Sequence, residues 1–230
     1  QTTLTPGLFG LVNTDHNEVP GGFAAAQGIY AVAYNDGANG SNTNKIAFLA
    51  QSSERLGLPI VIGTGNKPPL IATDGTNFLA VWSDDSTDNY NNRNLYGRFI
   101  EPDSECPSSN FQITTHAVDR KLAGLVYAAG RFLVVWEENQ PGGNGDILGA
   151  FVTPNLDGPP PQFNISALPT VEVDAVAASD GTNFMVAYQA LGSVGVSQFW
   201  NTFARRITPA GVVSSPVQVN QGTSADHWSL

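Results

Sequence analysis

The sequence predicts an all-β protein built from four copies of one unit, and three observations support this. First, one pattern of apolar strands and Gly-containing turns recurs, most clearly over residues 70–82 and 176–188. Second, no segment shows helical periodicity, whereas the short apolar runs bounded by turns are typical of buried strands. Third, Gly (24 residues) and Pro (15 residues) are abundant, as a turn-rich β protein requires.

The unit has a period of about fifty residues. An aromatic residue ends the second strand of each copy, with spacings of 48, 54 and 52 residues: Tyr34, Trp82, Trp136 and Tyr188. A period near fifty with four strands per unit is typical of propeller repeats. The sequence therefore predicts a single domain, 1–230, that is a four-bladed β-propeller of four-stranded antiparallel blades. A solenoid and a sandwich are the alternatives.

The blades are expected at about 20–67, 68–118, 119–173 and 174–220. Their first strands are rich in Ala and Gly, which suit a crowded centre, and lie at 23–27, 70–73, 122–129 and 176–179. The second strands are continuous apolar runs, expected to be buried on both faces, at 29–34, 78–82, 132–136 and 184–188. The third strands lie at 45–50, 95–100, 147–152 and 201–207, and proline ends three of them at Pro102, Pro154 and Pro209. The fourth strands are apolar-x-apolar segments at 60–62, 111–113, 163–165 and 217–219.

The turn between the first two strands takes two forms. Copies two and four contain the sequence Asp-Gly-Thr-Asn, at 74–77 and 180–183, whereas the turns of copies one and three are one residue shorter. Glycine supplies a positive φ, and the Asp and Asn side chains can bond the local backbone, so we expect hairpin turns here and no functional site. The alternation fits either duplication of a two-blade unit or independent drift.

Each end of the chain carries a surplus strand-like segment. Residues 9–12 resemble a fourth strand, and residues 226–229 resemble the approach to another first strand, within an N-terminal segment 1–19 and a tail 221–230. Three explanations stay open. The N-terminal segment adds a strand and closes the ring, the chain is part of a longer array, or the overhanging strands dock on a neighbouring subunit.

Composition narrows the functional class. The net charge is −10, which argues against nucleic acid and against anionic membranes, and favours divalent cations. No apolar run approaches the roughly 20 residues of a membrane helix. The single cysteine, Cys106, cannot form an intramolecular disulfide and is expected to be a bystander, with an intermolecular bridge as the alternative. The first residue is Gln1, as in a mature chain after removal of a leader, so we expect secretion.

The loops at one end of the propeller are rich in carboxylates. Loops after the second strands and before the first strands share this end, so one acidic face is expected there. Oxygen ligands on clustered loops suit Ca²⁺, and the candidate ligands are Asp84, Asp85, Asp88, Glu137 and Glu138. The segment 83–90 lacks the spacing of an EF-hand loop, and a solvated polar loop is the competing interpretation.

No catalytic constellation is evident. His16, His116 and His227 occupy unrelated repeat positions, and no zinc, nucleophile-elbow or phosphate-binding motif is present. Glu137 and Glu138 are neighbours at a strand end, so their side chains should diverge, whereas a glycosidase needs converging carboxylates.

Three aromatic residues fall outside the repeat pattern and are candidates for stacking on sugars, with ordinary packing as the alternative: Tyr90, Trp200 and Trp228.

The run Asp74 to Trp82, followed by a polar loop and Leu95 to Ile100, resembles the repeats of about fifty residues in bacterial secreted β-propeller proteins. Asp180 to Tyr188 resembles them too, whereas copy three keeps only Asp146 to Gly149 and copy one is the most divergent. The resemblance implies the propeller fold and an extracellular location. It implies no catalytic residues.

From these observations we expect a secreted, non-catalytic interaction or structural module at a cell surface or in an extracellular structure, self-assembling through its terminal strands or binding a protein partner. A glycan-binding lectin is the alternative, followed by a propeller glycosidase. No cofactor other than calcium is indicated.

Overall fold

The computed structural model describes residues 17–38, 41–84, 93–101, 108–115, 118–139, 145–194 and 197–220. These residues form four antiparallel sheets of four strands each, which follow one another in chain order. We call these sheets blades 1 to 4. The all-β class and the number of repeated units therefore agree with the sequence prediction.

Each blade is a simple meander in which neighbours in sequence are neighbours in the sheet. Blade 1 contains β1 (Glu18–Ala26), β2 (Ile29–Ala38), β3 (Ser41–Ala50) and β4 (Arg55–Thr64). Blade 2 contains β5 (Leu70–Thr73), β6 (Phe78–Asp84), β7 (Asn94–Ile100) and β8 (Phe111–Gln112). Blade 3 contains β9 (Asp119–Ala128), β10 (Arg131–Asn139), β11 (Gly145–Val152) and β12 (Gln162–Ser166). Blade 4 contains β13 (Glu172–Ser179), β14 (Phe184–Val194), β15 (Ser197–Ile207) and β16 (Val217–Gln218).

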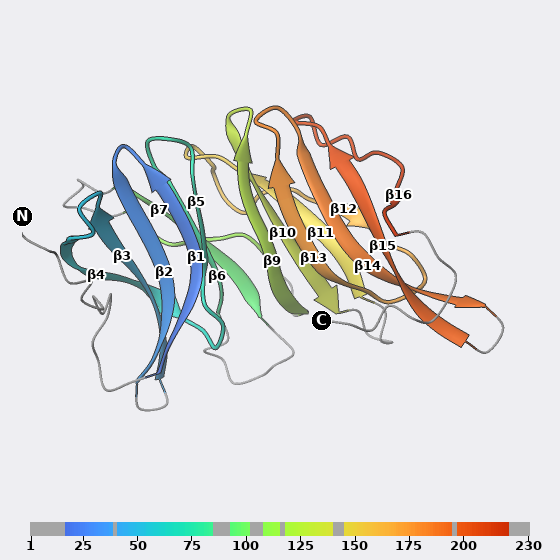
Figure 1. The fold of residues 1–230 in the computed structure, drawn as a ribbon, viewed down its shortest axis with the longest axis horizontal. Coiled ribbons are helices and arrows are strands. Elements are labelled where there is room, and N and C mark those ends of the chain that lie inside the picture. Colours follow the sequence, from blue (N-terminus) through green and yellow to red (C-terminus); the bar gives the residue numbers. More distant parts are fainter. Residues whose placement is uncertain are drawn as a thin grey trace, which may run out of the picture.

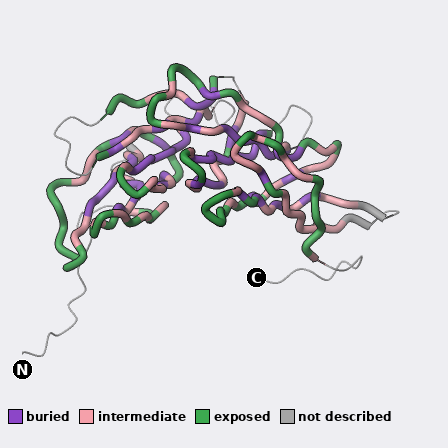
Figure 2. Tube along the Cα trace, turned by 90° about the horizontal axis from the view of Figure 1, so that it is seen from above, coloured by how far each residue is buried: buried purple, intermediate pink, exposed green. Residues whose placement is uncertain are grey.

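The blades stand side by side in an open arch. Their first strands lie next to one another, β1 beside β5, β5 beside β9 and β9 beside β13. Figure 1 shows blades 1 and 4 at opposite ends of the molecule, and Figure 2 shows the arch from above. Within the described part of the chain, no strand of blade 1 packs along a strand of blade 4. The arrangement is radial, but the four blades as described do not close a ring, and the terminal segments 1–16 and 221–230, which carry the predicted surplus strands, lie outside the described residues.

The first strands carry small residues because the blades come close together there. A Cβ atom on Gly22 would lie 2.4 Å from the backbone nitrogen of Ile71 in the next blade. A Cβ atom on Gly124 would lie 2.7 Å from the Cβ atom of Ala177. Real Cβ atoms do not approach other atoms this closely, so the expectation of small residues in these strands is confirmed, with blade-to-blade contact as its cause.

The side chains of a second strand point alternately toward the two neighbouring blades, because successive side chains of a strand point to opposite faces. In β10, Phe132, Val134 and Trp136 join a cluster with residues of blade 2. In the same strand, Leu133 and Val135 join a cluster with residues of blade 4. All five side chains are fully buried, so this strand is buried on both faces as predicted.

The same prediction is wrong for the second strands of the two end blades. Tyr30, in β2 of blade 1, is 38% exposed, although the residues at the same position in the other blades are at most 1% exposed: Phe78, Phe132 and Phe184. Met185, in β14 of blade 4, is 45% exposed, whereas its equivalents Leu79 and Leu133 are fully buried. The physical reason is that blades 1 and 4 each have a neighbour on one side only.

The two forms of the first turn are confirmed. Gln27 and Gly28 have φ values of 50° and 75°, and Ala129 and Gly130 have values of 47° and 80°, as two-residue hairpins of type I′ require. In blade 4, the Oδ1 atom of Asp180 accepts bonds from the backbone N–H groups of Thr182 (2.8 Å) and Asn183 (2.6 Å). The bonds from Asn183 and Thr182 lower the pKa of Asp180. These residues serve the turn.

The equivalent turn of blade 2 offers a test of this role. Asp74 Oδ1 accepts bonds from the N–H groups of Thr76 (2.8 Å) and Asn77 (2.7 Å). Asp74→Ala removes the oxygen that accepts both bonds, so we expect it to lower the free energy of unfolding by about 1–2 kcal/mol. Asp74→Asn keeps an acceptor oxygen and should cost clearly less. Urea denaturation of both variants checks this, and equal losses would contradict it.

Candidate functional site

The carboxylates predicted to form an acidic face do gather at one edge of the blades, but basic side chains lie among them. This edge is formed where the second strands end and the third strands begin. The ion pairs there are Lys45–Asp36 (2.5 Å), Arg93–Asp119 (3.5 Å), Arg120–Glu138 (2.9 Å), Lys121–Glu137 (3.1 Å) and Lys121–Asp174 (3.2 Å). We call these residues the rim network.

Glu137 and Glu138 diverge, as predicted for neighbours on a strand. Glu138 points toward blade 2, where Arg120 Nε donates to its Oε2 atom and Arg120 Nη1 donates to Asn94 of blade 2 (3.2 Å). Glu137 points toward blade 4, where its Oε1 atom accepts from the backbone N–H of Ala175 (3.3 Å). The two carboxylates therefore join blade 3 to different neighbours and do not converge on one substrate atom.

Glu172, the first residue of β13, lies next to the rim network and is fully buried. The Ser166 hydroxyl of β12 donates to one of its carboxylate oxygens. Burial raises the pKa of Glu172, and the hydrogen bond from Ser166 opposes that shift. Burial, with a smaller contribution from the charge of Glu138, also raises the pKa of Asp146. The shift of Glu172 follows from its burial between blades 3 and 4.

The raised pKa of Glu172 predicts a pH dependence. The folded protein holds this proton more tightly than the unfolded chain does, so the protonated carboxyl contributes to the free energy of unfolding. This contribution is fully present below the ordinary glutamate pKa of about 4.5, and it is lost as pH rises through the pKa of Glu172 in the folded protein. Glu172→Gln does not titrate, so we expect its stability relative to the unchanged protein to improve over that window, by at most about 1.4 kcal/mol per pH unit. Urea denaturation across pH 4.5–8 measures this. Glu101→Gln, at an exposed position, is the control, and parallel curves for Glu172→Gln and the unchanged protein would contradict the expectation.

The predicted metal ligands are only partly within the described structure. Asp85 and Asp88 lie outside the described residues. Asp84 accepts a hydrogen bond from the Thr64 hydroxyl of blade 1 (3.3 Å), and Glu137 and Glu138 belong to the rim network. Among the residues that the structure describes, no group of three His, Cys, Asp or Glu side chains is placed to hold a metal. Calcium binding stays a prediction.

The predicted sugar-stacking aromatics are likewise divided. Tyr90 and Trp228 lie outside the described residues, as do Cys106 and the three histidines. Trp200 lies in β15 and not in a loop, because β14 and β15 extend beyond the predicted strands as a long hairpin. Its side chain is half-buried and is paired in register with Leu191. Sugar stacking by these three aromatics stays a prediction.

The exposed apolar surface is concentrated on the two end blades. Every exposed large hydrophobic side chain among the described residues belongs to blade 1 or blade 4. Register places Phe23, Tyr30 and Val61 on the side of blade 1 that faces away from blade 2. Register likewise places Val176, Met185 and Val217 on the side of blade 4 that faces away from blade 3. We call these two surfaces the outer face of blade 1 and the outer face of blade 4.

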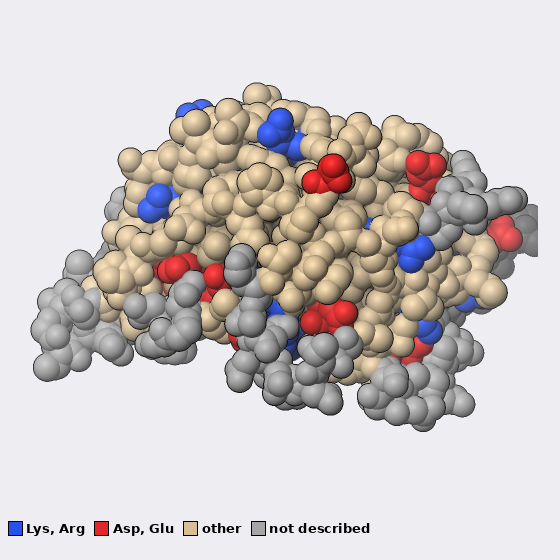
Figure 3. All heavy atoms as spheres, turned by 180° about the vertical axis from the view of Figure 1, so that it is seen from behind, with Lys and Arg blue, Asp and Glu red and all other residues tan. Residues whose placement is uncertain are grey.

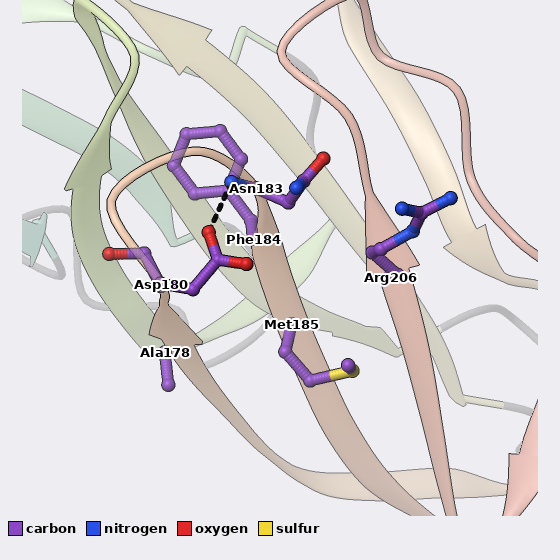
Figure 4. A pocket seen from close by; sticks show the side chains of 7 residues that line it. Ala178, Asp180, Asn183, Phe184, Met185 and Arg206 are labelled. Atoms are coloured by element: carbon purple, nitrogen blue, oxygen red, sulfur yellow. Dashed lines mark hydrogen bonds between the residues drawn. The ribbon is translucent and has the colours of Figure 1, made fainter.

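A hollow of about 260 Å³ lies at the outer face of blade 4, beside the Asp-Gly-Thr-Asn turn. Its lining includes Ala178, Met185 and Arg206, which form one row across β13, β14 and β15. Figure 4 shows these three side chains on adjacent strands, with Asp180 bonded to Asn183 in the turn above them. Arg206 is exposed here and Asp180 also lines the hollow, so an apolar floor is bordered by one group of each charge.

The side opposite to that of Figure 1 has a different character. Figure 3 shows the side opposite to that of Figure 1, where single charged side chains are scattered over a largely uncharged surface. The described residues contain no helix that is long and apolar enough to cross a membrane. Among the described residues, exposed large apolar side chains are found only on blades 1 and 4.

Sequence reasoning missed these two faces, although one signal was present. One position of the second strand is Ala31, Leu79, Leu133 and Met185 in blades 1 to 4. Its partners in the third strand are, in the same order, Phe48, Phe99, Phe151 and Arg206. An aligned column with three phenylalanines and one arginine marks blade 4 as different.

Comparison with known proteins bears on the fold alone. No family model matches the chain, and no curated protein matches it. Among solved structures, the β-propeller domain of the trilobed protease from Pyrococcus furiosus is similar at 10% identity, with a TM-score of 0.52 over 89% of this chain and 58% of that one. A subtype N10 neuraminidase-like protein of a little yellow-shouldered bat strain from Guatemala is similar at 10% identity, with a TM-score of 0.56 over 88% of this chain and 62% of that one. The acylaminoacyl peptidase of Pyrococcus horikoshii matches over 89% of this chain and 32% of its own, at 9% identity and a TM-score of 0.51.

Taken with the four radially arranged sheets, these likenesses show that the chain has a β-propeller fold of four blades. The chain spans about three fifths of the length of the first two of these structures.

Proposed function

We propose that this chain is a non-catalytic, extracellular interaction and structural module that binds a protein partner through the outer faces of blades 1 and 4. One observation carries the proposal: all exposed large hydrophobic side chains of the described residues lie on these two blades. Exposed apolar side chains gathered on one part of a protein are typical of an interaction site. An extracellular location is proposed from the repeat resemblance.

The physical support comes from equivalent positions. Where a blade has a neighbour, the positions corresponding to Tyr30 and Met185 are buried to at least 99% of their surface. Burying a large apolar side chain stabilises a complex by about 1.5–3 kcal/mol relative to leaving it exposed. The two outer faces therefore have the composition of a blade interface without the second blade.

Retention experiments test this function. The tagged chain and a tagged variant that carries Phe23→Glu and Val176→Glu are each incubated with proteins secreted by the source organism. The retained proteins are identified, and each complex is then reconstituted from purified components. We expect the unchanged chain to retain at least one protein that the variant does not retain. An untagged copy of the chain itself counts as such a protein. Identical retention by both chains would overturn the proposal.

The non-catalytic part of the proposal rests on the divergence of Glu137 and Glu138 and on their ion pairs. Assays on a panel of aryl glycosides check it directly. Turnover that Glu137→Gln or Glu138→Gln abolishes would overturn it in favour of a glycosidase.

A lectin is the second candidate, favoured by the half-buried Trp200 beside the long β14–β15 hairpin. Partly exposed tryptophan is a common platform for sugar rings. A glycan array, with and without EDTA, tests both the sugar and the calcium predictions. Strong binding that Trp200→Ala removes would support the lectin, and loss in EDTA would add calcium to its site.

A further inference from the structure

The three interfaces between blades repeat one aromatic contact. A residue of each third strand meets the first aromatic of the next blade's second strand. Phe48 packs on Phe78 with ring centroids 5.5 Å apart, Phe99 on Phe132 at 5.8 Å, and Phe151 on Phe184 at 5.4 Å. The rings are tilted by 61°, 63° and 48°, as aromatic pairs prefer. This contact is the constant element of blade-to-blade packing.

The two outer faces carry the two halves of a fourth such contact. On blade 4, the residue equivalent to Phe48, Phe99 and Phe151 is Arg206, which is paired with Met185 in the sheet. On blade 1, the residue equivalent to the second-strand phenylalanines is Tyr30, which stacks on Phe23 with centroids 5.9 Å apart. Neither position holds the phenylalanine found in the other blades. The two residues that replace it suit each other, because a guanidinium group is attracted to the electron-rich face of a tyrosine ring.

Tyr30 and Arg206 cannot meet within one chain in this structure. Blades 1 and 4 lie at opposite ends of the arch (Figure 1), and no strand of one packs along a strand of the other in the described residues. The complementary partner for the outer face of blade 1 is therefore the outer face of blade 4 in another copy. The hollow lined by Ala178, Met185 and Arg206 lies where the Phe23 and Tyr30 rings would enter.

The geometry points to a second copy of this chain as the occupant of both faces, which gives a closed ring of eight blades. In this ring, Tyr30 of each copy packs on Arg206 of the other, so a two-fold axis generates two identical junctions. Eight blades lie within the range of four to eight that is typical of propellers. This inference rests on the proposed function and specifies its partner.

Ring closure also explains which side chains are exposed. Joining the two copies would cover Phe23, Tyr30 and Val61 of one copy with Val176, Met185 and Val217 of the other. Tyr30 and Met185 would then be covered like the residues at their positions in the three existing interfaces, which are at most 1% exposed. No end face remains open, so the assembly stops at two copies.

Sedimentation and light scattering of the purified chain over the micromolar range test the ring. We expect a particle of about 49 kDa, twice the 24.3 kDa of one chain. Tyr30→Arg and Arg206→Glu are each expected to raise the dissociation constant about 10-fold or more. The two substitutions together in one chain should restore the dimer, because opposite charges then meet at both junctions. Both side chains are exposed, so folding should be unchanged, and circular dichroism checks this.

Matched controls are Thr76→Arg in the exposed turn of blade 2 and Lys67→Glu in an exposed loop, which change charge equally but lie outside both outer faces. In a mixture of the Tyr30→Arg chain with the Arg206→Glu chain, one junction of the heterodimer is unaltered and the other brings the introduced arginine against the introduced glutamate, so the heterodimer should form more tightly than the homodimer of either variant.

A strictly monomeric chain would overturn the ring. So would a dimer that Arg206→Glu leaves intact, since blade 1 would then face blade 1, or a mass that grows without limit, since the junctions would then form a filament. A monomer that still retains another protein through these faces would overturn the ring alone, whereas a monomer with identical retention by the Phe23→Glu, Val176→Glu variant would also overturn the proposed function.

Discussion

Phe132→Ala is expected to lower the free energy of unfolding by about 3–5 kcal/mol, because it opens a cavity between blades 2 and 3. The side chain is fully buried. Its ring lies 5.8 Å from that of Phe99 in blade 2 and 4.8 Å from that of Tyr127 in its own blade. Neither blade can shift to fill the space, because each also packs against another neighbour. Urea denaturation of the two proteins at equal, dilute concentration measures the difference.

The repeat provides a matched control for this prediction. Tyr30 occupies the same position in blade 1 but is 38% exposed, so Tyr30→Ala should cost less than about 1 kcal/mol in the monomer. A loss as large as that of Phe132→Ala would mean that the outer face of blade 1 is covered within a single chain. That result would also remove the basis for a second copy at this face.

Arg120→Leu is also expected to lower the free energy of unfolding by about 3–5 kcal/mol. It leaves the charge of Glu138 in a buried site without the guanidinium group. The side chain of Arg120 is 1% exposed and that of Glu138 is 10% exposed, with 2.9 Å between Nε and Oε2. Removing one member of a buried ion pair costs more than the pair contributes, since the remaining carboxylate is still desolvated.

The variant with both Arg120→Leu and Glu138→Leu separates charge from packing. We expect it to recover most of the lost stability, because two apolar side chains of similar size replace the pair and no buried charge remains. Urea denaturation of the single and double variants gives the coupling energy. A double variant as unstable as Arg120→Leu would show that Arg120 acts through packing and its bond to Asn94, and not through Glu138.

The repeat made much of the fold predictable. Trp82 and Trp136 are the last residues of the predicted second strands, whose apolar runs predict burial, and they are 1% and 0% exposed. The Asp-Gly-Thr-Asn turns were assigned to hairpins from local chemistry, and the bonds to Asp74 and Asp180 confirm this. Such features depend on a few neighbouring residues, so the sequence contains them completely.

The candidate site was predicted less well. The acidic residues at the ends of the second strands were recognised, but their basic partners Arg120 and Lys121 come from a different strand, and the pattern of acids alone favoured a metal. Trp200 falls just outside the predicted third strand 201–207 because the repeat pattern stops short of it, whereas hairpin pairing with Leu191 extends the strand. Partners that are distant in sequence are not visible in a local pattern.

The succession of strands, the period of the blades and the chemistry of their turns all follow from the order of residues along the chain, because each depends on contacts within one unit. Whether the ring closes does not. That outcome depends on the angle between neighbouring blades, which results from many side chains packed between sheets. The arch leaves Tyr30 and Arg206 at opposite ends, and this turns two ordinary repeat positions into a pair of surfaces that fit each other only across two molecules.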